Sequence, residues 1–217
     1  MSRDATPTRT AIMDAAETLI LESGFAASSI DKVIDKAGVT KGSFFYHFKT
    51  KGDLALALVE RYAANDAANL EAVTARAAQL SRDPLQQIII LVGLLREELA
   101  ELTAPVPGCL FASYCCEAQL FDDATLEVAR RSFIAWRERL GATLREAMAL
   151  RQPRYRVDAD SLADMLSVVV EGAFIMSKTL REPQLVARQL DHYRNYLELL
   201  FSPSEAESGG GARNGGM

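Results

Sequence analysis

The chain has 217 residues, of which 49% are apolar, and a formal net charge of −5. This length is enough for one or two domains with a substantial core. The longest apolar run, residues 88–95, is far shorter than the roughly 20 residues of a membrane span. The N-terminus lacks the apolar stretch of a secretory signal, and three clustered cysteines do not suggest a disulfide framework. We therefore expect a cytoplasmic protein with no membrane partner.

Residues 29–48 are the most informative stretch of the chain. Ser28 or Ser29 can cap a short helix, and Gly38 permits the left-handed turn that ends it. Thr40 can cap a second short helix, which follows at once. Two short helices joined by a tight turn form a helix-turn-helix motif, in which the N-terminal residues of the second helix face the base edges of the DNA major groove.

The candidate DNA contacts lie at the ends of these two helices. They are Ser28, Ser29, Thr40, Lys41, Gly42, Ser43, Phe45, Tyr46, His47, Lys49 and Lys51. Gly42 lets the backbone approach DNA closely, and Thr40, Lys41 and Ser43 are the side chains able to reach bases. The others would position the helix on phosphates.

The charge distribution favours the same surface. Residues 1–52 hold seven Lys and Arg against six Asp and Glu, whereas residues 53–217 hold 17 against 23. Four lysines and no acidic residue lie in residues 36–52. The acidic remainder of the chain would repel phosphate and help to orient the approach to DNA.

The whole chain is predicted to be all-α, with about nine helices. The expected helices are 10–23, two within 29–48, 50–80, 84–102, 109–120, 122–150, 158 or 160 to 180, and 184–201. We expect a DNA-binding domain over residues 1–52, a helical effector-binding and dimerisation domain over 53–201, and a disordered low-complexity tail over 202–217.

Two features of the larger domain suggest ligand binding and self-association. The aromatic and polar residues that could line an effector cavity are Phe111, Tyr114, Phe133, Trp136, Glu171 and Phe174, although ordinary core packing is the alternative for each. One apolar stripe on the penultimate helix comprises Leu162, Met165, Leu166, Val169, Ala173 and Met176. A second on the last helix comprises Leu185, Gln189, Tyr193, Tyr196 and Leu200. These stripes could form a four-helix interface between two chains, or could be buried within one chain.

The segment from Ala16 to Leu54 resembles the N-terminal domain of the TetR family of transcriptional regulators. It matches the pattern AxxLxxxxGFxxxSxxxIxxxAGVTKGSFFYHFKTKxDL. The resemblance implies a nucleoid-associated homodimer that binds a palindromic DNA operator, most often as a repressor, and releases it when a small-molecule effector binds. Family members commonly have Tyr where this chain has Phe45, so one hydroxyl contact with phosphate is lost here.

Cys109 follows a Pro-Gly break and is expected at a helix N-terminus, where the helix dipole can stabilise a thiolate. The PGCLF segment is similar to one in NemR-like members of the family, which respond to electrophiles and oxidants, and Lys178 is similar in place to a lysine of those regulators. Cys109 and Lys178 therefore form a candidate redox sensor, although simple core packing of Cys109 is the alternative.

Other chemistries have little support in the sequence. His47 and His192 have no neighbouring ligand motif, so no metal site is expected, and no cofactor motif is present. We find no catalytic motif and do not expect an enzyme. The remaining alternative is a helical ligand-binding or scaffold protein without DNA binding, which would lack the salt-dependent DNA affinity of a regulator.

Overall fold

A computed structural model describes residues 7–105 and 107–203, and over these ranges the chain is helical without a strand. The elements are α1 (Pro7–Ser23), α2 (Ile30–Ala37), α3 (Lys41–His47), α4 (Lys51–Leu80), α5 (Pro84–Ala100), α6 (Leu110–Cys116), the 3₁₀ helix η1 (Ala118–Leu120), α7 (Asp123–Leu150), α8 (Ala159–Leu180) and α9 (Leu185–Leu200). The predicted all-α fold is confirmed. Most of the predicted tail, residues 204–217, lies outside the described residues.

The first helices begin at the predicted capping residues. The Ser29 side chain accepts a hydrogen bond from the backbone at the start of α2, and Thr40 does the same for α3. Thr50 and Asp53 form a reciprocal capping box at the start of α4, which satisfies two backbone N–H groups. Gly38, with φ 64°, provides the left-handed turn between α2 and α3.

One predicted helix is interrupted. Residues 109–120 were expected to form a single helix, but α6 ends at Cys116 and η1 begins after Glu117. The Glu117 carboxylate accepts hydrogen bonds from the backbone N–H groups of Phe25 (2.6 Å) and Ala26 (2.8 Å). This contact across 91 or 92 positions of the chain coincides with the non-helical backbone at Glu117.

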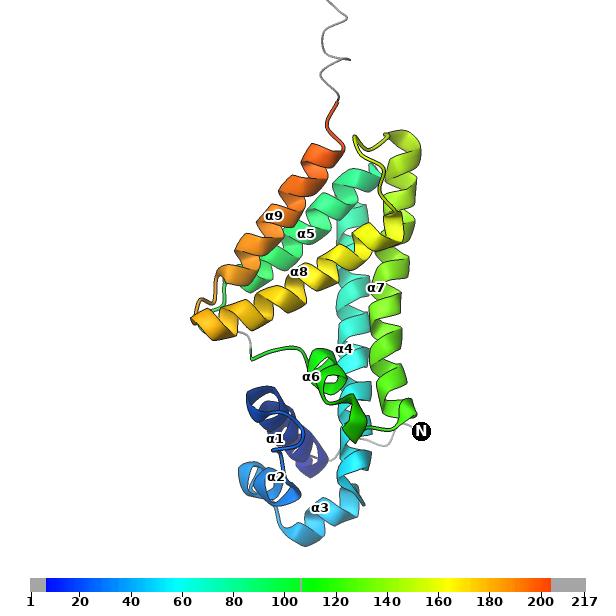
Figure 1. Cartoon of the computed structure of the whole chain (residues 1–217). Coiled ribbons are helices and arrows are strands. Elements are labelled where there is room, and N and C mark those ends of the chain that lie inside the picture. Colours follow the sequence, from blue (N-terminus) through cyan, green and yellow to red (C-terminus); the bar gives the residue numbers. More distant parts are fainter. Residues whose placement is uncertain (1–6, 106, 204–217) are drawn as a thin grey trace, which may run out of the picture.

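The described residues form two main hydrophobic cores that share one long helix. Helix α4 runs along the molecule and joins α1–α3 at one end to α5 and α7 at the other (Figure 1). The first core combines α1–α3 with the start of α4 and with α6. The second combines the end of α4 with α5, α7, α8 and α9. The boundary predicted at residues 52–53 lies in the first turn of α4, and the first core continues past it to Val59.

No helix in the described part of the chain is long and apolar enough to cross a membrane.

Candidate functional site

Helix α3 presents a polar face to solvent because its aromatic residues divide between two sides. Phe44 and Phe48, four positions apart, are buried in the first core. Lys41 and Gly42, in the first turn of α3, are exposed, and Tyr46 is 77% exposed. The N-terminal turn of the second helix of the motif is therefore accessible to a macromolecular partner.

The cations on this face are held only by exposed contacts. Lys41 lies 3.7 Å from the Asp31 carboxylate, and both side chains are more than two-thirds exposed. Ion pairs this exposed are worth about 0–1 kcal/mol, so a phosphate or base could replace Asp31 at little cost. The Lys49 ammonium donates a hydrogen bond to the Phe45 carbonyl (2.9 Å) and remains exposed.

Three predicted DNA contacts also have contacts within the fold. Ser28 is buried, and its hydroxyl donates a hydrogen bond to the Gly24 carbonyl (2.7 Å). The Lys51 ammonium lies 3.9 Å from the centroid of the Phe25 ring and donates to the Phe25 carbonyl, while burial lowers the pKa of Lys51. Phe45 is half-buried against the first core. The buried Ser28 hydroxyl is therefore directed into the fold, whereas Phe45 and Lys51 are only half-buried, and their contacts with DNA stay predictions.

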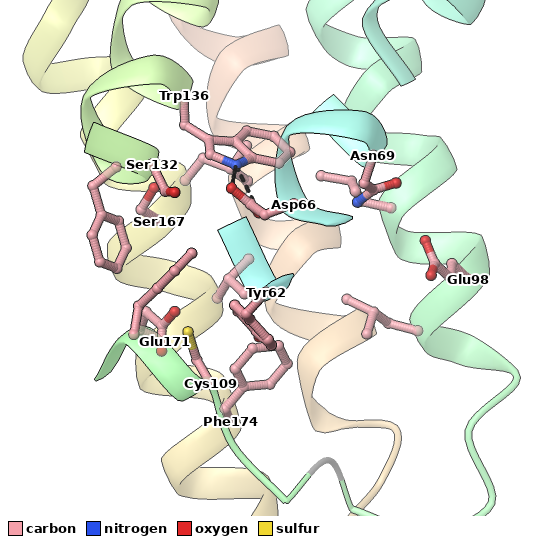
Figure 2. A pocket seen from close by; sticks show the side chains of 16 residues that line it. Tyr62, Asp66, Asn69, Glu98, Cys109, Ser132, Trp136, Ser167, Glu171 and Phe174 are labelled. Carbon is pink, nitrogen blue, oxygen red and sulfur yellow. Dashed lines mark hydrogen bonds between the residues drawn. The ribbon is translucent and has the colours of Figure 1, made fainter. Parts of the chain in front are cut away.

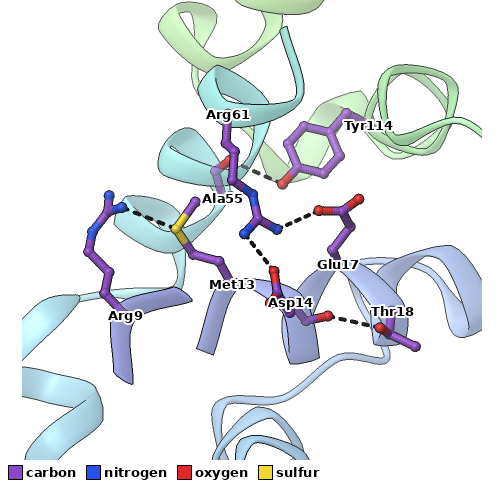
Figure 3. A network of polar contacts seen from close by, with 8 residues as sticks. All are labelled: Arg9, Met13, Asp14, Glu17, Thr18, Ala55, Arg61 and Tyr114. Atoms are coloured by element: carbon purple, nitrogen blue, oxygen red, sulfur yellow. Dashed lines mark hydrogen bonds and ion pairs between the residues drawn. The ribbon is translucent and has the colours of Figure 1, made fainter. Parts of the chain in front are cut away.

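Polar contacts hold the first helix against α4 (Figure 3). The guanidinium of Arg61 on α4 donates to Asp14 and to Glu17 on α1, each over 2.6 Å. Tyr114 of α6 is fully buried, and its hydroxyl donates to the Ala55 carbonyl of α4 (3.1 Å). Tyr114 therefore fixes α6 on α4 and does not line the cavity described next, so its prediction as a pocket residue is wrong.

A cavity of about 310 Å³ lies within the larger domain, between α4, α5, α7 and α8 and beside the start of α6 (Figure 2). The remaining predicted pocket residues all line it: Phe111, Phe133, Trp136, Glu171 and Phe174. Tyr62, Asp66 and Asn69 of α4 also line it, and the sequence interpretation missed them. Their i, i+4, i+7 spacing places them on one helix face, so helical periodicity could have identified them.

Two half-buried carboxyl groups face this cavity. The indole N–H of Trp136 donates to both carboxylate oxygens of Asp66, at 3.1 Å each (Figure 2). Burial raises the pKa of Asp66, and the indole hydrogen bond opposes that rise. Burial also raises the pKa of Glu171; a hydrogen bond with Cys109 opposes the rise and the charge of Asp66 adds to it.

Cys109 is the N-cap residue of α6, as predicted, but it is buried. Burial raises the pKa of its thiol to about 12, and the nearby charge of Glu171 adds to the rise. The Lys178 ammonium donates to the carbonyls of Leu21 (2.9 Å) and Pro107 (3.2 Å). Burial therefore opposes the thiolate stabilisation expected from the dipole of the seven-residue α6, and the Lys178 ammonium is directed to backbone carbonyls. The redox-sensor role of Cys109 and Lys178 stays a prediction.

The predicted dimerisation stripes are largely buried within the chain. On α8, Leu162, Leu166 and Ala173 belong to internal clusters, and on α9 so do Leu185, Tyr193 and Leu200. Met176 and Tyr196 of the predicted stripes are exposed, and so are Val168, Ile175 and Leu180 on α8 and Leu199 on α9. Most residues of the predicted stripes are therefore covered within one chain, and the dimer interface stays a prediction.

An all-α fold that joins an exposed helix-turn-helix to a helical domain with a cavity is typical of DNA-binding transcriptional regulators. The family model described as "Bacterial regulatory proteins, tetR family" matches residues 12–58. The model described as "Tetracyclin repressor-like, C-terminal domain" matches residues 84–193. The chain belongs to the TetR family. Regulators of this family bind DNA operators and form dimers, and they are typically not enzymes.

Individual relatives agree with this assignment. The chain is 26% identical over 180 residues to the transcriptional regulator AcuR of Cereibacter sphaeroides, covering 83% of this chain and 80% of the relative. It is 23% identical to the transcriptional repressor DhaR of Mycobacterium sp. strain GP1, covering 81% and 85%. A TetR regulator from Chloroflexus aurantiacus has a similar structure, with a TM-score of 0.69 at 25% identity over 90% of this chain and 96% of that one. Reduced NemR of E. coli has the same fold, with a TM-score of 0.66 at 20% identity over 87% and 95%.

Proposed function

We propose that the protein is a homodimeric repressor that binds a palindromic operator through α3 and leaves it when a small molecule occupies the internal cavity. The observation that carries this proposal is the position of α6. Cys109 and Phe111, at the start of α6, line the cavity and also belong to the hydrophobic core of the helix-turn-helix end. A ligand that displaces them therefore acts on the packing of the DNA-binding end.

Two further contacts support transmission from the cavity to the headpiece, meaning residues 7–48. Glu117, at the end of α6, holds the backbone of the loop after α1, and Lys178 of α8 holds the Leu21 carbonyl of α1. Movement of α6 or α8 would therefore change the orientation of the headpiece. An effector shifts the equilibrium only if it binds the DNA-incompetent arrangement more tightly.

Dimerisation is proposed through the exposed apolar faces of α8 and α9, represented by Val168 and Ile175 on α8 and by Leu199 on α9. Exposed apolar residues gathered on two adjacent helices are typical of a protein interface. Val168→Asp should give a monomer in sedimentation at micromolar concentration. Leu150→Asp, which alters an equally exposed leucine at the end of α7, is the matched control and should leave the dimer intact. A dimeric Val168→Asp variant would contradict this interface.

DNA recognition is tested by selecting fragments from a random pool and measuring affinity for the selected sequence against salt concentration. Lys41→Ala should weaken binding, relax the sequence preference and reduce the salt slope by about one phosphate contact. Arg156→Ala removes the same charge from the exposed loop before α8, far from the headpiece, and should bind normally (Figure 1). Equal affinities for wild type and Lys41→Ala would refute the proposed role of α3.

A further inference from the structure

The cavity is acidic as well as aromatic. Its lining includes the carboxyl groups of Asp66, Glu98 and Glu171. Among the described residues that line it, none is Lys, Arg or His. Asp66 and Glu171 are half-buried, whereas Glu98 is exposed on α5. The cavity therefore presents two internal negative groups and a third at its margin.

The internal carboxyl groups are held by neutral partners. Asp66 accepts from the Trp136 indole, and Glu171 interacts with the Cys109 thiol. Ion pairs of the described residues involve other carboxylates. Carboxylates removed from water without a cationic partner are destabilised. A cation inside the cavity would supply the missing charge, whereas an anion would be repelled by the same groups.

The remaining walls suit the rest of such a ligand. Five aromatic residues line the cavity: Tyr62, Phe111, Phe133, Trp136 and Phe174. Aromatic ring faces attract organic cations, and the attraction is stronger where water is excluded. Leucine and valine side chains complete an apolar lining suited to a hydrocarbon body.

We infer that the effector is an organic cation, an ammonium group carried on an apolar body, with its charge beside Asp66 and Glu171. This inference rests on the proposed function, because it takes the cavity to be the effector site. A volume of about 310 Å³ accommodates a small amphiphilic ligand of this kind.

Binding is tested on the full chain with three probes of equal non-hydrogen atom count: phenyltrimethylammonium, its neutral isostere tert-butylbenzene, and the anion phenylacetate. Trp136 is the single tryptophan of the sequence and lines the cavity, so its fluorescence reports occupancy. Phenyltrimethylammonium should change this fluorescence at concentrations at least about tenfold lower than either other probe. Equal or tighter binding of tert-butylbenzene or phenylacetate would overturn the inference.

Charge-neutral variants assign the binding to the two carboxyl groups. Asp66→Asn and Glu171→Gln preserve side-chain shape, and each should weaken phenyltrimethylammonium binding by about tenfold while leaving tert-butylbenzene unchanged. Glu60→Gln is the matched control, since Glu60 is exposed on the same helix as Asp66 and lies outside the cavity lining. Unchanged cation affinity in both cavity variants, each checked for wild-type circular dichroism, would refute the assignment.

DNA release separates this inference from the proposed function. Phenyltrimethylammonium should release the selected operator from wild type, and Asp66→Asn should require about tenfold more of it. If the protein binds the selected DNA, but phenyltrimethylammonium neither binds the protein nor releases the DNA, the ligand class is wrong and the repressor proposal stands. If the cation binds in the cavity while no DNA sequence is selected, the ligand class stands and the proposed function fails.

Discussion

Replacing Glu117 with alanine should destabilise the protein more than any ordinary surface substitution. The Glu117 carboxylate accepts two backbone hydrogen bonds, from the partly buried N–H of Phe25 and the exposed N–H of Ala26. A hydrogen bond to a charged acceptor is worth about 1.5–3 kcal/mol, and water can replace only the exposed one. We therefore expect a loss of about 2–4 kcal/mol in the free energy of unfolding, or about 5–10 °C in Tm for a chain of this size.

Thermal unfolding at one fixed protein concentration measures this loss, because dimerisation makes Tm concentration-dependent. Glu97→Ala removes an exposed carboxylate from α5 and should melt within about 1 °C of wild type. A Cβ at Gly24 would lie 2.6 Å from Glu117 Oε1, at a φ of 84°. Gly24→Ala should consequently lower the free energy of unfolding less in the Glu117→Ala background than in wild type. A Glu117→Ala variant that melts with the control would refute the bridging role.

Three further outcomes concern the cysteines, Asp66 and Lys178. In a thiol titration of the native protein, the exposed Cys115 and Cys116 should react quickly and the buried Cys109 slowly, with all three reacting alike in urea. Folding raises the pKa of Asp66 above 3.8, so the free energy of unfolding of wild type should fall as pH rises through that raised pKa. In melting curves recorded at a series of pH values, Asp66→Asn should show a smaller fall in stability than wild type. Lys178→Ala removes the hydrogen bond to the Leu21 carbonyl of α1 and should raise the effector concentration needed for half-maximal DNA release.

Local signals predicted the helix-turn-helix end well because its geometry is determined by neighbouring residues. Thr40 and Thr50 each cap a helix by accepting from the N–H group three positions away, and Gly38 supplies a turn that other residues adopt only with strain. Ser28 shows the limit of such signals. Its neighbour Ser29 takes the capping position, and Ser28 is then buried against the Gly24 carbonyl.

Long-range burial could not be predicted in the same way. Helix α8 is apolar on more than one side, so periodicity identified an apolar stripe without showing which neighbour covers it. The stripe through Leu166 packs inside the chain, and the side carrying Val168 faces outward. For Cys109, sequence position correctly gave the helix start, but the sign of the pKa shift depended on desolvation by residues distant in the chain.

The raised pKa values of Asp66 and Glu171 give the proposed regulation a physical basis. Keeping these groups in a half-buried aromatic cavity destabilises their ionised forms in the empty protein, because burial opposes the charge. A bound cation would favour those ionised forms and stabilise whichever arrangement of α4 and α8 brings the two carboxyl groups closest to it. Helix α6 borders the same cavity through Phe111 and belongs to the core of the headpiece. The arrangement that the cation stabilises would therefore also change the position of α3, and a cation that binds the DNA-incompetent arrangement more tightly would release DNA.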